Sequence, residues 1–274
     1  MSSRIFAVTP QDALPTFARL YSCTEPDFAG MVDQMTAAWL VRDKAGEVLG
    51  ALGLRPSPSH GAEVMGGAFP GSAQQQAAIM LLQAALDAQP QLYAYAEADF
   101  LLAAALQAAG LRVFSAYTRM SGPLPTQSAN VPDGFSIVAL SKVTRLDDRM
   151  AAQLTYADRI GHTLFTAKDV ASGAGGCDDT LSRLAYDASR LPAGICRAWL
   201  EGEQVSFSTP GVRLGVRETG LRQALILSVC EAARAAGATQ LTLQAWGDTP
   251  EERADDLALG LDIEKEHPIY VSGS

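Results

Sequence analysis

Positive charge is scarce in this chain of 274 residues. Its 21 Lys and Arg are outnumbered by 30 Asp and Glu, which gives a formal net charge of −9 at pH 7. A protein that binds nucleic acid needs clustered Lys and Arg to neutralise phosphates, and the sequence contains no run rich in these residues. We therefore expect no nucleic acid among its partners.

Cysteine and histidine are scarce too. The four cysteines, Cys23, Cys177, Cys196 and Cys230, lie far apart and form no Cys-x-x-Cys pair, and the three histidines are equally scattered. Metal sites usually draw their ligands from recognisable pairs of such residues. We therefore expect reduced structural thiols and no metal site.

Long apolar runs are absent as well. Gln, Asp or Arg interrupts each of the longest apolar stretches before it reaches the roughly 20 residues of a membrane span. The first residues lack the charged segment and the apolar run of a secretory signal. We expect a cytoplasmic protein that does not enter a membrane. Apolar residues still make up 48% of the chain, which is enough for a hydrophobic core.

An internal repeat is the first positive signal in the sequence. Residues 39–54 read as strand, turn and strand, and residues 183–198 read the same way. Each hairpin is followed by a long helical pattern, a further strand, an acidic residue, a short helix and a closing Gly-Leu pair. The same order of elements in both halves indicates two related domains.

The segment between the halves, residues 121–134, is rich in Pro, Gly and Ser, which marks a linker. We place the boundary near residue 128, so that residues 1–128 form one domain and residues 129–274 form the other. Hairpins followed by a strand–helix–strand crossover predict an α/β fold of the mixed α+β type. Each domain is expected to contain a mixed, mostly antiparallel sheet flanked by helices.

The second half can be divided more finely by its turns and its hydrophobic periodicity. These patterns place a strand, a short loop and a long helix in succession after residue 204. The predicted strands are residues 136–140, 180–187, 194–200, 204–212, 240–246 and 267–271, and the predicted helices are residues 146–160, 221–236 and 250–259.

The strand–loop–helix is the part that predicts a binding site. The strand ends near Val212, a short loop follows, and an amphipathic helix begins near Thr219. The first turn of a helix has unpaired backbone N–H groups and the positive end of the dipole, so it can bind an anion such as a pyrophosphate. Gly220 allows close approach to the backbone, and Arg217 and Arg222 add positive charge.

This loop resembles the signature of the GNAT (GCN5-related N-acetyltransferase) superfamily. That signature is Gln/Arg-x-x-Gly-x-Gly/Ala after a strand and at the start of a helix, and here it reads Arg217-Glu-Thr-Gly220-Leu-Arg222. The order of elements in the second half is similar to that of the family, and the repeat extends the resemblance to the first half. The tandem arrangement looks like that of mycothiol-synthase-type double GNAT proteins.

The resemblance implies two tandem GNAT-like domains, with acetyl-CoA or another acyl-CoA bound in the second. The main chain around Val212 is expected to pair with pantetheine, and the amides of residues 218–222 are expected to hold the pyrophosphate. The strand at residues 241–243 is expected to diverge from the strand at residues 204–212 and open a cleft. The implied cofactor-binding residues are Gly211, Val212, Arg217, Glu218, Thr219, Gly220, Leu221 and Arg222.

The sequence departs from the family pattern in both halves. Arg222 replaces the usual small residue. Asp256 stands where family members often carry a Tyr that protonates the leaving thiolate, and an ionised Asp cannot donate a proton at neutral pH unless its pKa is raised. Ala73 and Gln76 replace the Arg and Gly of the motif in the first half, which is therefore expected to be degenerate. We assign no catalytic residue from the sequence.

Several other polar residues have two interpretations each. His162 lies between two predicted helices, where similar proteins bind their acceptors, or it is an ordinary loop residue. Tyr270 either packs in the core, which we favour, or lines an acceptor site. Glu201 and Glu203 fit a polar hairpin turn better than a general base, and His267 fits a loop.

The expected function is that of a GNAT-type N-acetyltransferase. It would move an acetyl group from acetyl-CoA to an amine of a small molecule or peptide, by direct attack of the amine on the thioester. A backbone N–H on the diverging strand would polarise the thioester carbonyl. The alternative is a non-catalytic GNAT-like module that binds CoA or serves as a scaffold, which Asp256 and the degenerate first half favour.

Overall fold

The computed structural model describes residues 3–162 and 165–273, which form two compact units. Unit 1 consists of Met1–Ala116, Ile160–Thr163 and His267–Ser274, and unit 2 consists of Tyr117–Arg159 and Leu164–Glu266. Helices flank a mixed, mostly antiparallel sheet in each unit, which confirms the predicted fold class. The domain boundary at residue 128 stays a prediction.

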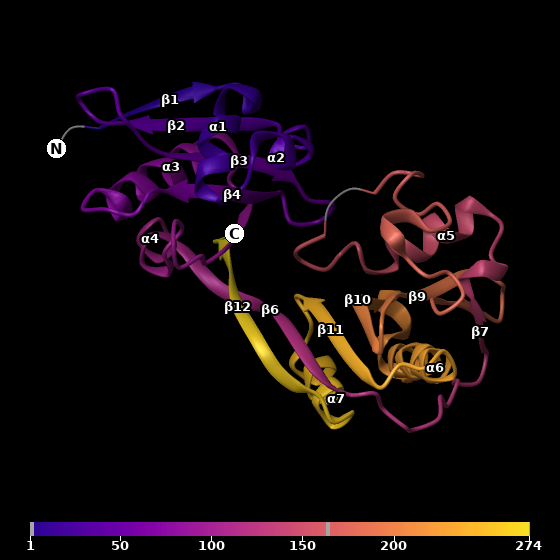
Figure 1. Cartoon of the computed structure of the whole chain (residues 1–274). Coiled ribbons are helices and arrows are strands. Elements are labelled where there is room, and N and C mark those ends of the chain that lie inside the picture. The colour runs from indigo at the N-terminus through magenta and orange to yellow at the C-terminus, as the bar shows by residue number, and fades with distance from the viewer. Residues whose placement is uncertain (1–2, 163–164, 274) are drawn as a thin grey trace. The chain divides into compact units, whose positions relative to one another are not determined.

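Unit 1 is organised around a sheet that contains β1 (Arg4–Val8), β2 (Ala37–Arg42), β3 (Val48–Pro56), β4 (Ala62–Ala68), β5 (Leu92–Tyr95) and the end of β12 (Asp262–Ser272). Strands β1 to β5 lie in sequence order, and Figure 1 labels the first four of them. The pairs β1–β2, β2–β3 and β3–β4 are antiparallel, whereas β4 and β5 are parallel. β5 also pairs antiparallel with β12 through Ile269, Tyr270 and Val271.

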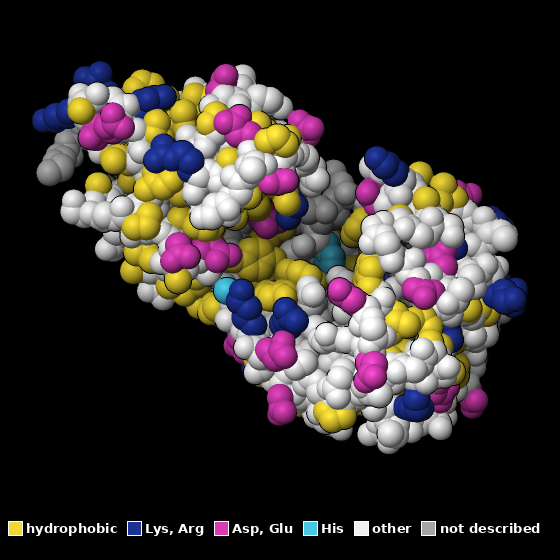
Figure 2. Space-filling model, in the orientation of Figure 1, with side chains coloured by type: hydrophobic (Ala, Val, Ile, Leu, Met, Phe, Trp, Pro, Cys, Tyr) yellow, Lys and Arg dark blue, Asp and Glu magenta, His cyan; other side chains and the backbone are white. Residues whose placement is uncertain are grey.

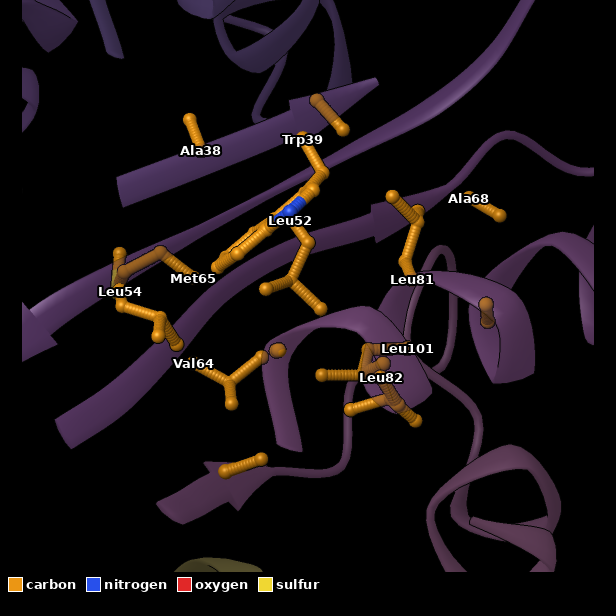
Figure 3. Close-up of a cluster of buried hydrophobic side chains, with 14 of the residues drawn as sticks. Ala38, Trp39, Leu52, Leu54, Val64, Met65, Ala68, Leu81, Leu82 and Leu101 are labelled. Carbon is orange, nitrogen blue, oxygen red and sulfur yellow. The ribbon is translucent and has the colours of Figure 1, made fainter. Parts of the chain in front are cut away.

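The helices of unit 1 are α1 (Pro10–Leu20), α2 (Glu25–Val32), α3 (Gln74–Ala88) and α4 (Ala103–Ala108). Thr9 begins α1 with a capping box, in which its side chain accepts from the Asp12 N–H and the Asp12 carboxylate accepts in return. Strand side chains such as Leu52 pack in one core with Leu81 and Leu82 of α3 (Figure 3). This core joins the sheet of unit 1 to its helices.

The sheet of unit 2 contains β6 (Leu111–Pro123), β7 (Phe135–Ala139), β8 (Arg183–Asp187), β9 (Pro192–Glu201), β10 (Gln204–Val212) and β11 (Gln240–Trp246). Its strand order is β6-β11-β10-β9-β8-β7. β10 and β11 are parallel, and the other neighbours are antiparallel. β6 begins in unit 1 and ends in unit 2, whereas β12 does the opposite, so each sheet includes a strand end from the other half of the sequence.

The helices of unit 2 are α5 (Leu146–Gln153), α6 (Leu221–Ala235) and α7 (Pro250–Ala258), with 3-10 helices η1 (Leu140–Lys142), η2 (Leu154–Tyr156), η3 (Ala174–Gly176) and η4 (Leu214–Thr219). α6 packs on β9 and β10 (Figure 1). Its side chains Leu225 and Val229 are fully buried. Gly237 ends α6 with φ +97°, and the next N–H, of Ala238, donates to the Ala233 carbonyl at 2.9 Å. A glycine in the left-handed conformation commonly ends a helix in this way.

One predicted helix is wrong in length, although β10 and β11 have the predicted bounds. The helix expected at residues 146–160 ends at Gln153, and η2 follows. The cause is local, because the Thr155 hydroxyl donates to the Ala152 carbonyl at 2.6 Å and so competes for an acceptor that a longer helix would use. The residues after η2 make the contacts described below instead of continuing the helix.

The final strand is also longer than predicted. β12 begins at Asp262, whereas the prediction began at residue 267. Residues 262–266 are exposed, so they lack the alternation of buried apolar and exposed polar side chains that marks a strand in a sequence. Glu264 on this segment accepts a hydrogen bond from Ser121 and forms an ion pair with Arg119 at 3.0 Å.

The surface carries both signs of charge. Figure 2 shows Lys/Arg and Asp/Glu side chains interspersed on the visible face, and the described residues do not gather positive charge into one patch there. Within the described ranges, no helix combines the length and the apolar character that crossing a membrane requires.

Candidate functional site

β10 and β11 separate part-way along their length. They are paired from Gln204 opposite Gln240 to Ser208 opposite Gln244. Beyond that point β10 continues against β9 as far as Val212, while β11 continues against β6. The predicted divergence is therefore present, but it begins after Gln244 and not at residues 241–243, which are still paired. We call the region beyond Ser208 and Gln244 the β10–β11 split.

A bulge lies in β10 where the split begins. The register against β9 shifts between Ser208 and Gly211, and Thr209 within the shift has φ +45°. A Cβ on Gly211 would lie 1.9 Å from Cδ1 of Tyr156, so the ring of η2 packs directly on the main chain at this point. Position 211 therefore requires a glycine, because the Tyr156 ring leaves no room for a side chain. Val212 beside it packs in the core under α6.

The loop after β10 ends at an open helix N-terminus. Residues Leu214–Thr219 form η4, and Gly220 is the N-cap of α6 with φ +82°. A Cβ at Gly220 would meet no described atom within 4 Å, so there is open space beside this residue. Glycine is therefore favoured here by the left-handed backbone conformation and not by a close neighbour. The first N–H groups of α6 have no acceptor within the helix, and they carry the positive end of its dipole.

A pocket of about 880 Å³ lies at this N-terminus, within the size range of small-molecule sites. Both η4 and the start of α7 contribute to it. Its lining residues are Arg159, Leu214, Gly215, Arg217, Glu218, Thr219, Gly220, Arg222, Gln223, Thr249, Glu251, Glu252 and Asp255. The predicted residues 217–220 and Arg222 therefore meet in one pocket, while Gly211 and Val212 lie on β10 and Leu221 is buried.

Arg217 is held by a neighbour that the sequence did not identify. Its two terminal nitrogens donate to the Asp158 carboxylate at 2.6 and 2.9 Å, and its Nε donates to the Val212 carbonyl at 3.2 Å. Burial acts to raise the pKa of Asp158, but the hydrogen bonds and charge of Arg217 outweigh it and the pKa lies below its usual value. The guanidinium is thus at the pocket but already paired with a carboxylate.

Arg222 requires a correction to the predicted role of its side chain. Its guanidinium is buried and donates to both oxygens of Asp256, at 2.7 and 2.8 Å, and to Asp248 at 2.9 Å. These bonds fix α6 to α7 and to the loop after β11. The side chain therefore neutralises two carboxylates and is not available to a phosphate, whereas the predicted contact through its main-chain N–H stays a prediction.

Asp256 takes no part in the pocket. The residue is 0% exposed, and both of its carboxylate oxygens accept from Arg222. An ionised carboxylate in this position cannot protonate a leaving thiolate. Asp248, the second partner of Arg222, has its pKa raised to about 6 by burial, against the opposing charge of Arg222.

Residues 156–159 connect the elements around the split. Tyr156 packs on Gly211, and Asp158 pairs with Arg217 of η4. Arg159 donates to the Glu252 carboxylate at 2.6 and 2.7 Å and to the Gly247 carbonyl at 3.2 Å, on the far side of the split. No sequence pattern indicated these contacts, because residues 146–160 were expected to form one helix.

The corresponding region of unit 1 is filled by its own chain. β4 and β5 are paired only at Ala62–Leu92 and Glu63–Tyr93 among the described residues, so these strands also separate. The turn at residues 97–101 packs there, and its Phe100 carbonyl accepts from the Ala68 N–H at 2.8 Å. A Cβ on Gly67 would lie 2.2 Å from the same carbonyl oxygen, which shows how closely the turn packs on β4.

The other polar candidates do not line this pocket. Tyr270 is buried in the core of unit 1, so the packing interpretation is confirmed. Glu203 lies in the β9–β10 hairpin, where its carbonyl accepts from the Thr239 and Gln240 N–H groups. His162 belongs to unit 1, and its carbonyl accepts from Ser57 at 3.3 Å. His267 lies in β12 and not in a loop. The described residues contain no group of three or more His, Cys, Asp and Glu that could hold a metal ion.

No protein-family model matches the sequence, and neither does any curated protein sequence. Solved structures do match over nearly the whole chain. A GCN5-related N-acetyltransferase from Sphaerobacter thermophilus is 18% identical, with 98% of this chain and 95% of that chain covered and a TM-score of 0.57. A tandem GNAT protein from the clavulanic acid biosynthesis pathway is 16% identical, with 99% and 98% covered and a TM-score of 0.53. The chain has a tandem GNAT-type fold.

A further GNAT-fold relative supports the same assignment. A GCN5-related N-acetyltransferase from Anabaena variabilis is 14% identical, with 98% of this chain and 72% of that chain covered and a TM-score of 0.60. At such identities the likeness establishes the GNAT fold alone.

Proposed function

We propose that unit 2 binds an acyl-CoA, with acetyl-CoA as the first candidate, at the N-terminus of α6 and along the β10–β11 split. The observation that carries the proposal is the conjunction of Gly220, which leaves the helix N-terminus open, with a strand that is unpaired on one side immediately before it. The similarity to structures described as N-acetyltransferases supports the same proposal.

The residues present fit a pyrophosphate mainly through the backbone. Of the arginines that line the pocket, Arg159, Arg217 and Arg222 are all paired with carboxylates. Glu218 and Asp255 add negative charge to the rim. The N–H groups of residues 218–222 would therefore supply most of the attraction, at about 1.5–3 kcal/mol for each hydrogen bond to a charged group.

The pantetheine arm would lie along β10, beside Gly211 and Val212. Main-chain groups of a strand that has lost its neighbour can form the hydrogen bonds that a strand partner would form. Acetyl-CoA, when bound, supplies an activated thioester. This chain would orient that thioester and polarise its carbonyl through a backbone N–H at the bulge.

The reaction we propose is transfer of the acyl group to an amine of a small molecule or peptide. The amine nitrogen forms a bond to the carbonyl carbon, the carbon–sulfur bond breaks, and the amine loses a proton while the thiolate gains one. Asp256 cannot supply that proton, because Arg222 holds both of its oxygens. We assign the general acid and base to no residue.

Calorimetric titration of the full chain with acetyl-CoA tests the proposal. Gly220→Trp would place a ring at the helix N-terminus and should abolish binding. Gly134→Trp is the matched control, because Gly134 has the same φ of +82° and a Cβ there would meet no described atom within 4 Å, but it does not line the pocket. Equal binding by both variants, or no binding by the unaltered protein at millimolar cofactor, would refute the proposal.

We expect one acetyl-CoA to bind per chain. In unit 1 the 97–101 turn fills the space where β4 and β5 separate.

A second candidate function is a GNAT-like module that binds CoA without turnover or serves as a scaffold. The burial of Asp256 favours it, since the usual position of the proton donor holds a structural carboxylate. A screen of amines with detection of free thiol separates the candidates. Thermal stabilisation by CoA without release of thiol from acetyl-CoA supports the module, whereas amine-dependent release supports the transferase.

A further inference from the structure

Thr209 combines two unfavourable features at one position of β10. The residue is 4% exposed, and its Oγ1 has no hydrogen-bond partner among the residues that the structure describes. Its φ of +45° lies in the left-handed region, which a β-branched residue rarely adopts. A buried hydroxyl without a partner and a strained backbone both reduce stability, and both are concentrated at functional sites.

The position of Thr209 connects these features to the split. Ser208 is the last residue of β10 that pairs with β11, so Thr209 is the first residue beyond that pairing. Thr209 also lies inside the register shift against β9, and the pairing of the two strands resumes at Gly211. The backbone strain is therefore located where β10 stops pairing with β11, at the start of the split.

The distance along β10 indicates which part of a ligand would reach Thr209. Val212 is three positions after Thr209, which is roughly 10 Å of extended chain. η4 begins at Leu214, two positions after Val212, and Gly220 follows the end of η4. A cofactor with its pyrophosphate at Gly220 and its pantetheine along β10 would therefore bring its thioester, and not its phosphates, to the bulge.

We propose that the Thr209 hydroxyl donates a hydrogen bond to the carbonyl oxygen of the bound thioester. This inference rests on the proposed binding of acyl-CoA to unit 2. A hydroxyl has one donor, and a thioester carbonyl offers an acceptor whose negative charge increases when an amine attacks. The hydrogen bond would satisfy the buried oxygen and orient the acyl group at the same time.

Thr209→Val removes the hydroxyl and keeps the branched shape of the side chain. We expect the affinity for acetyl-CoA to fall about tenfold, the usual effect of losing one hydrogen bond of this kind. The affinity for free CoA, which has no carbonyl at the sulfur, should change less than about twofold. Thr209→Ser should restore the acetyl-CoA affinity. Without ligand, Thr209→Val should melt at the same temperature as the unaltered protein or higher, because an unsatisfied polar group has been removed.

A matched control removes a hydroxyl that does have a partner. Thr242 on β11 accepts from the Gln204 side chain and is also buried. Thr242→Val should lower the melting temperature and leave the ratio of the acetyl-CoA and CoA affinities unchanged. Thr209→Gly is a second variant that removes the same hydroxyl, and glycine accepts a φ of +45° without strain. It allows the affinity to be measured even if the Val variant does not fold.

The outcomes separate this inference from the proposed function. If the unaltered protein binds neither acetyl-CoA nor CoA, both are refuted. If it binds acetyl-CoA and the Val and Gly variants bind it equally well, only the role of Thr209 is refuted. An equal loss of affinity for acetyl-CoA and for free CoA also refutes it, because the contact would then not be to the acyl carbonyl.

Discussion

The Arg217–Asp158 ion pair offers a quantitative test of how the pocket would receive an anion. In the free protein the Arg217 guanidinium donates twice to Asp158, at 2.6 and 2.9 Å. A phosphate that recruits Arg217 has to break this pair. Asp158→Asn weakens the pair and removes one negative charge near the pocket, so it should increase the affinity for acetyl-CoA.

The exposure of the two side chains sets the size of the effect. Arg217 is 15% exposed and Asp158 is 44% exposed, so solvent screens the pair and its coupling is worth about 1 kcal/mol. Removing it corresponds to about a fivefold lower dissociation constant for acetyl-CoA. The gain should shrink as the salt concentration is raised from about 50 mM to about 500 mM, because screening weakens the competing pair.

Calorimetry on Asp158→Asn, Arg217→Gln and the double variant provides the assay. The gain from Asp158→Asn should become smaller when Arg217 is absent, because the part of the gain that comes from releasing Arg217 is then lost. Asp187→Asn is the control, since Asp187 accepts from Arg213 at 2.8 Å in unit 2 but neither residue lines the pocket. Weaker binding by Asp158→Asn, or the same gain with Arg217 replaced, would show that phosphate does not compete for Arg217.

Two further predictions concern the buried ion pairs of Arg222. Asp256→Asn leaves this guanidinium with Asp248 as its remaining charged partner. It should lower the free energy of unfolding, measured by urea titration, by about 3 kcal/mol. A loss below about 0.5 kcal/mol would contradict the structural role of the pair. Burial raises the pKa of Asp248 from 3.8 to about 6, so the folded protein keeps a proton that the unfolded chain has lost. The contribution of Asp248 to the free energy of unfolding should therefore fall as pH rises from about 4 to about 6. Asp248→Asn should remove that part of the pH dependence, and an unchanged difference between about pH 4.5 and pH 7 would contradict it.

The sequence was sufficient for the strand–loop–helix because its signals are local. Apolar alternation, a glycine at the helix start and a glycine at its end all lie between Gln204 and Gly237, and the bounds of β10 and β11 were predicted correctly. Gly220 was predicted to allow close approach to the backbone, and the structure gives it a left-handed conformation. Local signals also identified the hairpins of both halves.

The side-chain partners could not be predicted in this way. Asp158 lies 59 residues from Arg217, and Asp248 and Asp256 lie 26 and 34 residues from Arg222. Nothing in the sequence indicates that these carboxylates pair with Arg217 or Arg222. The ion pairs of Arg222 therefore could not be predicted, because only the fold brings Asp248 and Asp256 to this guanidinium.

The two units treat the same separation of parallel strands differently. In unit 1 the split is closed by main chain, because the Phe100 carbonyl bonds the Ala68 N–H and the 97–101 turn contributes buried apolar side chains. In unit 2 residues 156–159 reach the elements around the split through side chains, two of which form ion pairs. An anionic ligand can exchange with an ion pair, whereas it cannot replace a buried apolar turn without exposing it to water. A ligand that binds through phosphates should therefore select unit 2, even though both units keep the parallel strand pair that creates a split.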